Sequence, residues 1–332
     1  MNTARHGWDR RVRALVAIAC CAVALVCSCA TPEQPAPAVT RVAHTSAPPD
    51  VRVVIVVIDG PRYSETFGDP LHTHVPQLWN VLAPQGTICS NFRNLGVTTT
   101  NPGHGTLLSG IWQFIDDEGV TRIPSPTLFE YYRKAWGVPA SDALLVTGKI
   151  KLGAVAYSTS AAYGASFGAT TDLDTPHDID TYDHLIQHLD AESPHLVMCS
   201  FSDVDQAGHS GVWSDYLHSI NVVDSLVNLT WNHLQSSPDY AGRTYMFVTA
   251  DHGRHDDAHG GFKEHGDGCD GCRHTIFLAL GPGIRAGQAI DTAYSQQNLC
   301  NTVGRLMNLP TTESPGIIMT DLFDALPTGV LH

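Results

Sequence analysis

The run VRVVIVVI, residues 51–58, is apolar at seven of its eight positions and consists mainly of β-branched side chains. A strand with one face in water alternates apolar and polar residues, whereas a strand covered on both faces of a parallel sheet is apolar throughout. Residues 51–58 are therefore predicted to form a central strand. Four further runs have the same character: SDALLVTG (141–148), PHLVMCSF (194–201), RTYMFVTA (243–250) and HTIFLALG (274–281).

Two segments between these runs have the spacing of amphipathic helices. TLFEYYRKAWG spans residues 127–137, and YLHSINVVDSLVNLTWNHLQ spans residues 216–235. In the second segment several apolar side chains fall near one helix face: Leu217, Ile220, Val223, Leu226 and Leu234. Alternation of strands and helices predicts an α/β fold, with a mostly parallel central sheet flanked by helices in a single compact domain.

The N-terminal segment is typical of a secreted protein. Arg10, Arg11 and Arg13 lie just before the apolar run ALVAIACCAVALVCSCA, which is short for a membrane span, so residues 1–28 are predicted to be a signal peptide. The run ends in VCSC, which resembles a bacterial lipobox and predicts lipid attachment at Cys29. An ordinary signal peptide and an uncleaved anchor are the alternatives. Residues 29–50 are rich in Pro and Ala and are expected to form a tether. This tether would connect a catalytic domain, residues 51–332, to a lipid anchor in the bacterial cell envelope. The alternative is a periplasmic or secreted protein.

Composition limits the partners of this chain. The net charge is −14, and loss of residues 1–28, with four Arg and one Asp, would make it −17. Such acidity argues against binding of nucleic acid or anionic membranes through a basic patch, and it does not predict an oligomeric state. Five cysteines follow Cys29: Cys89, Cys199, Cys269, Cys272 and Cys300. We expect a loop disulfide, either Cys269–Cys272 or a longer one, with the connectivity left open, since one C-x-x-C pair alone is weak support for structural zinc.

Acidic residues follow three of the predicted strands. Asp59 comes directly after the first strand, Asp203 and Asp205 follow residues 194–201, and Asp251 follows residues 243–250. Aspartate is a common turn residue, and one such case would need no further explanation. Here three strands are followed by Asp, and His209 and His252 lie near two of these carboxylates. This pattern places carboxylates and imidazoles at one edge of the sheet and predicts a metal site there.

The segment GVTTTNPGHGTLLSG, residues 96–110, reads as a turn that opens a helix. The N-terminus of a helix favours a phosphate group, and a metal could activate a threonine oxygen there. The alternative is that the hydroxyls of residues 98–100 only cap the helix.

Five motifs in this order resemble the alkaline phosphatase superfamily, especially its nucleotide pyrophosphatase/phosphodiesterase and Thr-nucleophile phosphatase branches: VVIVVIDG, TTTNPGHGTLLSG, DVDQAGHSG, TADHG and EHGDG with IFLALGPGI, within residues 51–283. The resemblance implies that Thr100 is the nucleophile and that two Zn²⁺ ions, or other divalent transition metals, are bound. It assigns one ion to Asp59, Thr100, Asp251 and His252, and the other to Asp205, His209 and His265, with His274 as second choice for the last. His104 is expected to support the turn, and residues 255–259 are expected to form a polar loop.

The same resemblance implies a phospho-threonine intermediate, hydrolysed by water activated at the second metal. Sulfatases carry Cys or Ser at the nucleophile position, followed by Pro and Arg, so sulfate esters are not expected as main substrates. A small-molecule phosphoester is expected, with monoesters ahead of diesters because Lys149 and Lys151 would lie on one face of a strand. Solvent exposure of both lysines is the alternative. In the diesterase branch an Asn donates a hydrogen bond to a phosphoryl oxygen, but this sequence has Asp116 and Asp117 in that region. Asn101 is a candidate to take over this role.

Three other functions compete with a phosphatase. A type I phosphodiesterase or nucleotide pyrophosphatase has the same nucleophile and metals. A phosphonate-cleaving or phosphomutase-like enzyme is the second alternative, although a cytoplasmic mutase fits poorly with a secretion leader. A non-catalytic zinc-binding lipoprotein would need the His and Asp residues but not Thr100.

Overall fold

The computed structural model describes residues 48–326. The predicted signal peptide, Cys29 and most of the tether lie outside the described residues, so these remain predictions. The strands are β1 (Arg52–Ile58), β2 (Thr87–Cys89), β3 (Phe92–Arg93), β4 (Ala143–Thr147), β5 (Thr170–Leu173), β6 (Leu196–Phe201), β7 (Thr244–Thr249), β8 (His274–Thr275), β9 (Phe277–Leu280), β10 (Gln288–Ile290) and β11 (Tyr294–Ser295). The α-helices are α1 (Thr100–Ser109), α2 (Leu128–Trp136), α3 (Asp178–Glu192), α4 (Asp203–Ser210), α5 (Trp213–Ser236), α6 (Asp270–Arg273) and α7 (Gln296–Met307).

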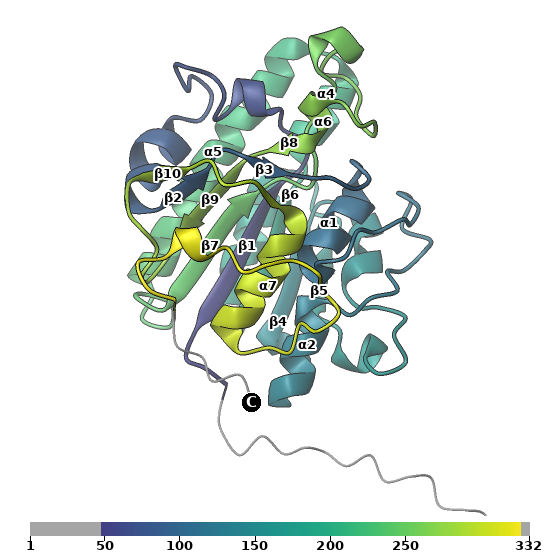
Figure 1. The fold of residues 1–332 in the computed structure, drawn as a ribbon, viewed down its shortest axis with the longest axis vertical. Coiled ribbons are helices and arrows are strands. Elements are labelled where there is room, and N and C mark those ends of the chain that lie inside the picture. Colours follow the sequence, from purple (N-terminus) through teal and green to yellow (C-terminus); the bar gives the residue numbers. More distant parts are fainter. Residues whose placement is uncertain (1–47, 327–332) are drawn as a thin grey trace, which may run out of the picture. The chain divides into compact units, whose positions relative to one another are not determined.

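One large sheet organises these elements. Its eight strands within residues 48–326 lie in the order β10-β2-β9-β7-β1-β6-β4-β5, and β3, β8 and β11 form a smaller sheet (Figure 1). The central strands β7, β1, β6 and β4 and the edge strand β5 are mutually parallel. The predicted α/β fold with a mostly parallel sheet is confirmed.

Strand β1 explains why residues 51–58 are apolar at nearly every position. Val53, Ile55 and Val57 pack on one side of the sheet against α1, α2 and α7. Val54, Val56 and Ile58 pack on the opposite side, in the core that α3 and α5 cover. Successive side chains of a strand point to opposite faces, so burial on both faces requires apolar residues throughout.

The two predicted helices are present with nearly the expected limits, as α2 and α5. Thr127 caps α2 by accepting a hydrogen bond from the backbone N–H of Glu130, whose carboxylate accepts one from the backbone N–H of Thr127. Gly137 ends α2 in the left-handed conformation. No helix within residues 48–326 is both long and apolar enough to cross a membrane.

Two details of the sheet differ from expectation. The run 274–281 forms two short strands, β8 and β9, and β9 lies antiparallel to β7 and β2. Apolar patterning shows that a strand is buried but not its direction. Strand β4 ends at Thr147, where the chain enters a 3₁₀ turn over Ile150–Val155, so Lys149 and Lys151 do not belong to a strand.

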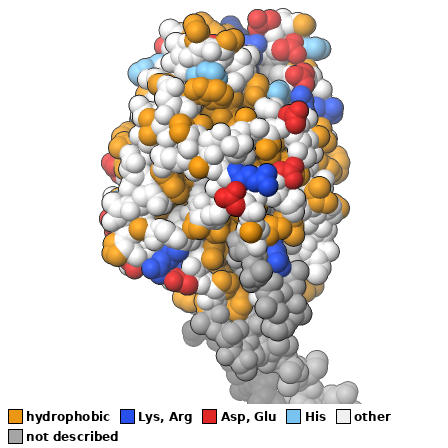
Figure 2. Space-filling model, turned by 60° about the vertical axis from the view of Figure 1, so that its left-hand side comes forward, with side chains coloured by type: hydrophobic (Ala, Val, Ile, Leu, Met, Phe, Trp, Pro, Cys, Tyr) orange, Lys and Arg blue, Asp and Glu red, His pale blue; other side chains and the backbone are white. Residues whose placement is uncertain are grey.

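On the face shown in Figure 2, the Lys and Arg side chains lie in small groups beside Asp and Glu side chains. Neighbouring charges of opposite sign largely cancel each other's field beyond a Debye length. That face therefore offers no broad basic surface. The expectation about nucleic acid remains a prediction for the whole chain.

Candidate metal centre

The three strands that lead to the predicted carboxylates are neighbours in the sheet. Strand β1 lies between β6 and β7 and runs parallel to both, so all three end at the same edge. Asp59 follows β1 directly, Asp251 lies two residues after β7, and Asp205 lies in the first turn of α4, shortly after β6. Asp59 and Asp251 are fully buried, and Asp205 is nearly so.

Asp59, Asp251 and His252 form a first cluster, with ligand atoms that all lie within 4.8 Å of one another. The Nε2 atom of His252 lies 3.6 Å from Oδ1 of Asp59 and 3.4 Å from Oδ2 of Asp251. Nδ1 of His252 lies 2.8 Å from the carbonyl oxygen of Gly253, which can only accept, so Nδ1 carries the proton. In the neutral ring, Nε2 therefore points a lone pair at two carboxylates.

Asp205, His209 and His265 form a second cluster beside the first. Nε2 of His265 lies 3.5 Å from Oδ1 of Asp205, and Nε2 of His209 lies 3.3 Å from the same oxygen. The two Nε2 atoms are 3.1 Å apart. Helix α4 explains the spacing of Asp205 and His209, since residues four apart lie on one helix face.

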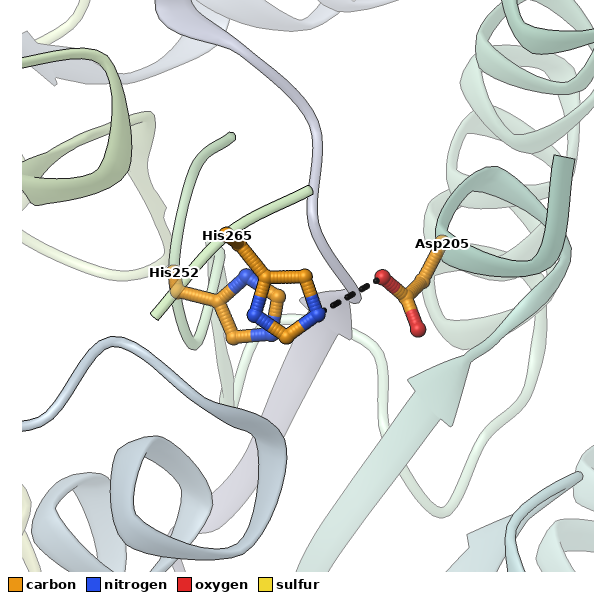
Figure 3. A group of neighbouring side chains, drawn as sticks. All are labelled: Asp205, His252 and His265. Atoms are coloured by element: carbon orange, nitrogen blue, oxygen red, sulfur yellow. Dashed lines mark ion pairs between the residues drawn. The ribbon is translucent and has the colours of Figure 1, made fainter. Parts of the chain in front are cut away.

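His265 is oriented in the same way as His252. Its Nδ1 atom lies 3.0 Å from the carbonyl oxygen of Thr98, so the Nδ1 proton is donated there and Nε2 faces Asp205 (Figure 3). The rings of His252 and His265 are stacked, with centroids 3.9 Å apart. Histidines that bind metals commonly fix their tautomer by such a hydrogen bond from the other ring nitrogen.

The pKa values of these groups reflect burial and mutual proximity. Burial raises the pKa of Asp59 to about 7, and the charge of Asp251 adds to the effect. Burial lowers the pKa of His265 to about 3 and also lowers that of His252, so both rings are neutral. For Asp251 the effect of burial is outweighed by His252 and His104, which lower its pKa. Above about pH 7 the site thus presents neutral imidazoles and carboxylates, the forms in which these side chains bind metals.

Several atoms of the first cluster have no hydrogen-bond partner although they are buried. They are Oδ1 of Asp59, Oδ2 of Asp251 and Nε2 of His252. Leaving such atoms unpaired is costly, and a cation between them removes the cost. The residues present therefore fit a divalent metal ion.

The second cluster is partly neutralised by two cations: Lys149, which was predicted to lie at this edge, and Arg254, which sequence reasoning missed. The fully buried guanidinium of Arg254 donates to Oδ1 of Asp205 and to the carbonyl oxygens of Phe262 and Lys263. Nζ of Lys149 lies 2.6 Å from Oδ2 of Asp205 and 2.7 Å from Oδ2 of Asp59. Burial opposes the charge of Lys149, but Asp59 and Asp205 outweigh it and raise the pKa of this ammonium group. A metal at Asp205 therefore competes with both cations, and a metal at Asp59 competes with Lys149.

Thr100 is the first residue of α1 and is fully buried, with Oγ1 located 3.4 Å from Nζ of Lys149. Thr99, at the N-cap, makes no capping hydrogen bond through its side chain, and Thr98 donates to the carbonyl oxygen of Asp267. Capping therefore does not account for these hydroxyls. His104 donates from Nδ1 to the carbonyl oxygen of Thr100 and lies 3.3 Å from Asp251, as expected of a residue that supports the turn.

The two other predicted substrate-binding residues differ in their surroundings. Asn101 is buried beside Thr100, and neither atom of its side-chain amide has a hydrogen-bond partner. Lys151 lies 2.7 Å from Asp117, outside the carboxylate clusters. The expectation that Lys149 and Lys151 project together from a strand is wrong, because the chain turns after Thr147.

The remaining histidines and cysteines of residues 249–274 lie away from this centre. His274 stacks on Tyr63 and bonds to the carbonyl oxygen of Ser90, so His265 is the residue placed at the cluster. Asp257 pairs with Arg62 at 2.7 Å. The expected Cys269–Cys272 disulfide is wrong, since both thiols are free in the structure. Spacing alone could not distinguish a disulfide from free thiols held by other partners.

Comparisons with known proteins agree with this architecture. A sequence model described as the Metalloenzyme superfamily matches residues 159–312, which include Asp205, His209, Asp251, His252 and His265. A sulfatase of the fungus Metarhizium majus is 32% identical over 111 residues, covering 33% of this chain and 24% of that protein. The match thus spans about a quarter of the curated relative.

Solved structures share the fold over most of the chain. A sulfatase-like protein from Bacteroides thetaiotaomicron superposes with a TM-score of 0.64 at 17% identity, covering 85% of this chain and 76% of that chain. The murine ectonucleotide pyrophosphatase/phosphodiesterase 5, in an inactive variant bound to AMP, gives a TM-score of 0.62 at 15% identity, covering 82% and 100% of the two chains. Phosphonate monoester hydrolases and a Vibrio parahaemolyticus protein of the alkaline phosphatase superfamily share the fold as well. The predicted resemblance is confirmed at the level of the fold.

Proposed function

We propose that this chain, which has the fold of the alkaline phosphatase superfamily, hydrolyses phosphate esters with Thr100 as nucleophile and divalent metal ions as cofactors. The observation that carries the proposal is the position of Thr100. Its hydroxyl lies at the start of α1, next to the ammonium group of Lys149, which in turn contacts both Asp59 and Asp205. A protein that only stores zinc has no need of a hydroxyl at this point.

The metal ligands would be those of the two clusters. Asp59, Asp251 and His252, with Thr100, would hold one ion, and Asp205, His209 and His265 would hold the other. Zinc fits imidazole and carboxylate ligands, and other divalent transition metals accept the same set. Bound ions would neutralise the carboxylates and stabilise negative charge on the oxygens of the ester.

The residues of this chain perform the remaining steps. Thr100 Oγ1 forms a bond to phosphorus as the bond from phosphorus to the leaving oxygen breaks, giving a phospho-threonine and an alcohol. The hydroxyl proton goes to solvent, and the leaving oxygen takes a proton from solvent. Water then hydrolyses the phospho-threonine and regenerates Thr100. Lys149 stabilises the alkoxide form of Thr100 by donating a hydrogen bond to it.

Two neighbours of Thr100 are suited to bind the phosphoryl group. Lys149 supplies a positive charge next to the nucleophile, and the unpaired amide of Asn101 supplies two N–H donors. Lys151 pairs with Asp117 outside the clusters, so Lys149 is the one of these two ammonium groups that lies beside Thr100. Because the positive charge of Lys149 favours a dianionic phosphate, we retain phosphate monoesters as the preferred substrates, with diesters as the alternative.

Sulfate esters are a second candidate class, because the aligned curated relative is a sulfatase. The test uses zinc-loaded protein with p-nitrophenyl phosphate, bis-p-nitrophenyl phosphate and p-nitrophenyl sulfate, before and after chelation. We expect turnover of a phosphate ester that chelation abolishes and zinc restores. Asp205→Asn should remove it, whereas the control Asp203→Asn, in the same helical turn but bonded to the backbone of Asp178, should retain most of it. Faster turnover of the sulfate than of either phosphate would overturn the assignment.

A further inference from the structure

A second group of metal-ligating side chains lies outside the candidate catalytic centre, in the connection between β7 and β8. This connection, residues 250–273, has one four-residue helix and one 3₁₀ turn and buries few hydrophobic side chains. Loops of this length without a core of their own are uncommon in compact domains. Nevertheless it carries His252, Arg254 and His265, whose positions define the catalytic centre.

Two sets of ligand groups with no residue in common gather in this loop, and each contains one histidine and one cysteine. His255, Asp267 and Cys272 have ligand atoms that all lie within 4.8 Å of one another, and so do Asp256, His259 and Cys269. Both thiols are free, and both are buried, Cys272 completely. Neither set shares a residue with the catalytic clusters.

The spacing of these residues is that of a structural zinc site. His255 and His259 form a His-x₃-His pair, and Cys269 and Cys272 form a Cys-x₂-Cys pair ten residues further along. Structural zinc sites combine two such pairs, and thiolate with imidazole is a ligand set that selects zinc. The sequence alone did not reveal that the two pairs meet.

Each histidine also has a carboxylate beside it. Nδ1 of His259 lies 2.6 Å from Oδ1 of Asp256, and Nε2 of His255 lies 3.4 Å from Oδ2 of Asp267. The carboxylate of Asp256 binds Nδ1 of His259 and would fix the orientation of that ring in a metal site. Nε2 of His255 is buried without a hydrogen-bond partner and is available as a ligand atom.

The backbone holds the two pairs together. The N–H of Gly253 donates to the carbonyl oxygen of Cys272, and the turn at Gly271 lies against the histidine-bearing arm. A Cβ atom on Gly271 would lie 2.5 Å from the carbonyl oxygen of Arg254 and 2.7 Å from the backbone N of Asp256. Only glycine permits this approach of the Cys-x₂-Cys turn to His255.

We propose that Cys269, Cys272, His255 and His259 bind a structural Zn²⁺ ion, with Asp256 and Asp267 as outer carboxylates. The ion crosslinks the two arms of the loop and thereby fixes His265 and Arg254 against Asp205. This site is independent of the proposed catalytic metals and remains if those are assigned wrongly.

Cobalt substitution tests the proposal, because a thiolate ligand gives Co²⁺ an intense near-ultraviolet charge-transfer absorption and the catalytic clusters contain no thiolate. Full-length protein, purified with its thiols reduced, is stripped of metal and titrated with Co²⁺. We expect the thiolate absorption in the wild type and in Asp251→Asn. It should be lost in Cys269→Ser/Cys272→Ser and retained in the control Cys300→Ala, which removes another buried thiol.

The titration has outcomes that overturn the proposal. The proposal is wrong if the reduced wild type shows no thiolate absorption, or if the double cysteine variant still shows it. A Cys269–Cys272 disulfide in protein isolated without reductant, detected as a linked peptide, would overturn it too. If the double variant does not fold, His259→Asn, at an exposed histidine, should still weaken Co²⁺ binding by at least about tenfold. Unchanged binding in that variant would exclude His259 as a ligand and overturn the proposed site.

Discussion

The Nζ atom of Lys149 lies 3.4 Å from the Oγ1 atom of Thr100, within a group of buried carboxylates. The same ammonium group contacts Asp59 and Asp205, one from each cluster. Lys149 is therefore the one described side chain for which contacts to Thr100 and to both clusters are observed. Its charge and location suit it to bind the phosphoryl group as Thr100 attacks.

Replacement of Lys149 by alanine should lower kcat/KM for a phosphate monoester by about 10²- to 10³-fold, the usual effect of removing one stabilising donor at a reacting oxygen. Lys151→Ala is the matched control, because Lys151 pairs with Asp117 outside the clusters, and its activity should remain within about threefold of wild type. Steady-state kinetics with mono- and diester measure both. A larger loss in Lys151→Ala would contradict this placement, and equal loss on both esters in Lys149→Ala would contradict a specific role in binding the dianion.

Zinc should stabilise the folded protein through the first cluster. A ligand present at 1,000 times its Kd raises the free energy of unfolding by about 4 kcal/mol. His252→Ala removes a buried ligand and should abolish most of the stabilisation that zinc gives through this cluster. Denaturant unfolding with and without zinc measures the difference, with Asp203→Asn as a control that should respond like the wild type. An unaltered zinc response in His252→Ala would show that the ion binds elsewhere.

Gly103 should not tolerate substitution, because α1 passes very close to the backbone of Asp251 at this position. A Cβ atom at this position would lie 2.5 Å from the carbonyl oxygen of Asp251, so Gly103→Ala must push α1 away from the end of β7. Thr100 and Asp251 would then separate, and we expect activity to fall by at least about 10²-fold. Gly153→Ala, whose Cβ would meet only a leucine side-chain atom at 3.2 Å, is the control and should stay near wild type. Full activity in Gly103→Ala would refute the close approach.

Asp224 should make stability depend on pH. Burial raises the pKa of this carboxyl to about 6, although it accepts hydrogen bonds from the N–H groups of Gln77 and Leu78. The folded state therefore holds its proton more tightly than the unfolded state, whose pKa is near 3.8. As pH rises from about 4 to about 6, this residue should lower the free energy of unfolding by about 3 kcal/mol in total. The difference between wild type and Asp224→Asn, measured by urea unfolding across that range, isolates the effect, and a pH-independent difference would refute it.

Much of the fold was accessible from the sequence because burial on both faces of a sheet demands apolar runs. The run 51–58 identified the central strand, and the aspartates after three runs identified the edge where the clusters lie. Asp205 and His209 were correctly paired on spacing, since one helical turn brings them together. These predictions depend on periodicity and on strand ends, both of which are local properties of the chain.

The remaining features depend on contacts between distant segments. Arg254 lies in a run of polar residues, and nothing local indicates that it is buried against Asp205. Lys149 and Lys151 diverge because β4 ends at Thr147 and the chain then enters a 3₁₀ turn over Ile150–Val155. Cys269 and Cys272 suggest a disulfide until the loop places two histidines and two carboxylates around them.

Turnover by Thr100→Ala tests the central claim most directly. Wild type and variant, each shown by metal analysis to carry the same zinc, are compared for hydrolysis of p-nitrophenyl phosphate, with Thr100→Ser as the variant that keeps a hydroxyl. The account predicts that kcat falls by at least about 10³-fold in Thr100→Ala and far less in Thr100→Ser. A Thr100→Ala protein that retains zinc and hydrolyses the ester within about tenfold of the wild-type rate would contradict a nucleophilic role for Thr100.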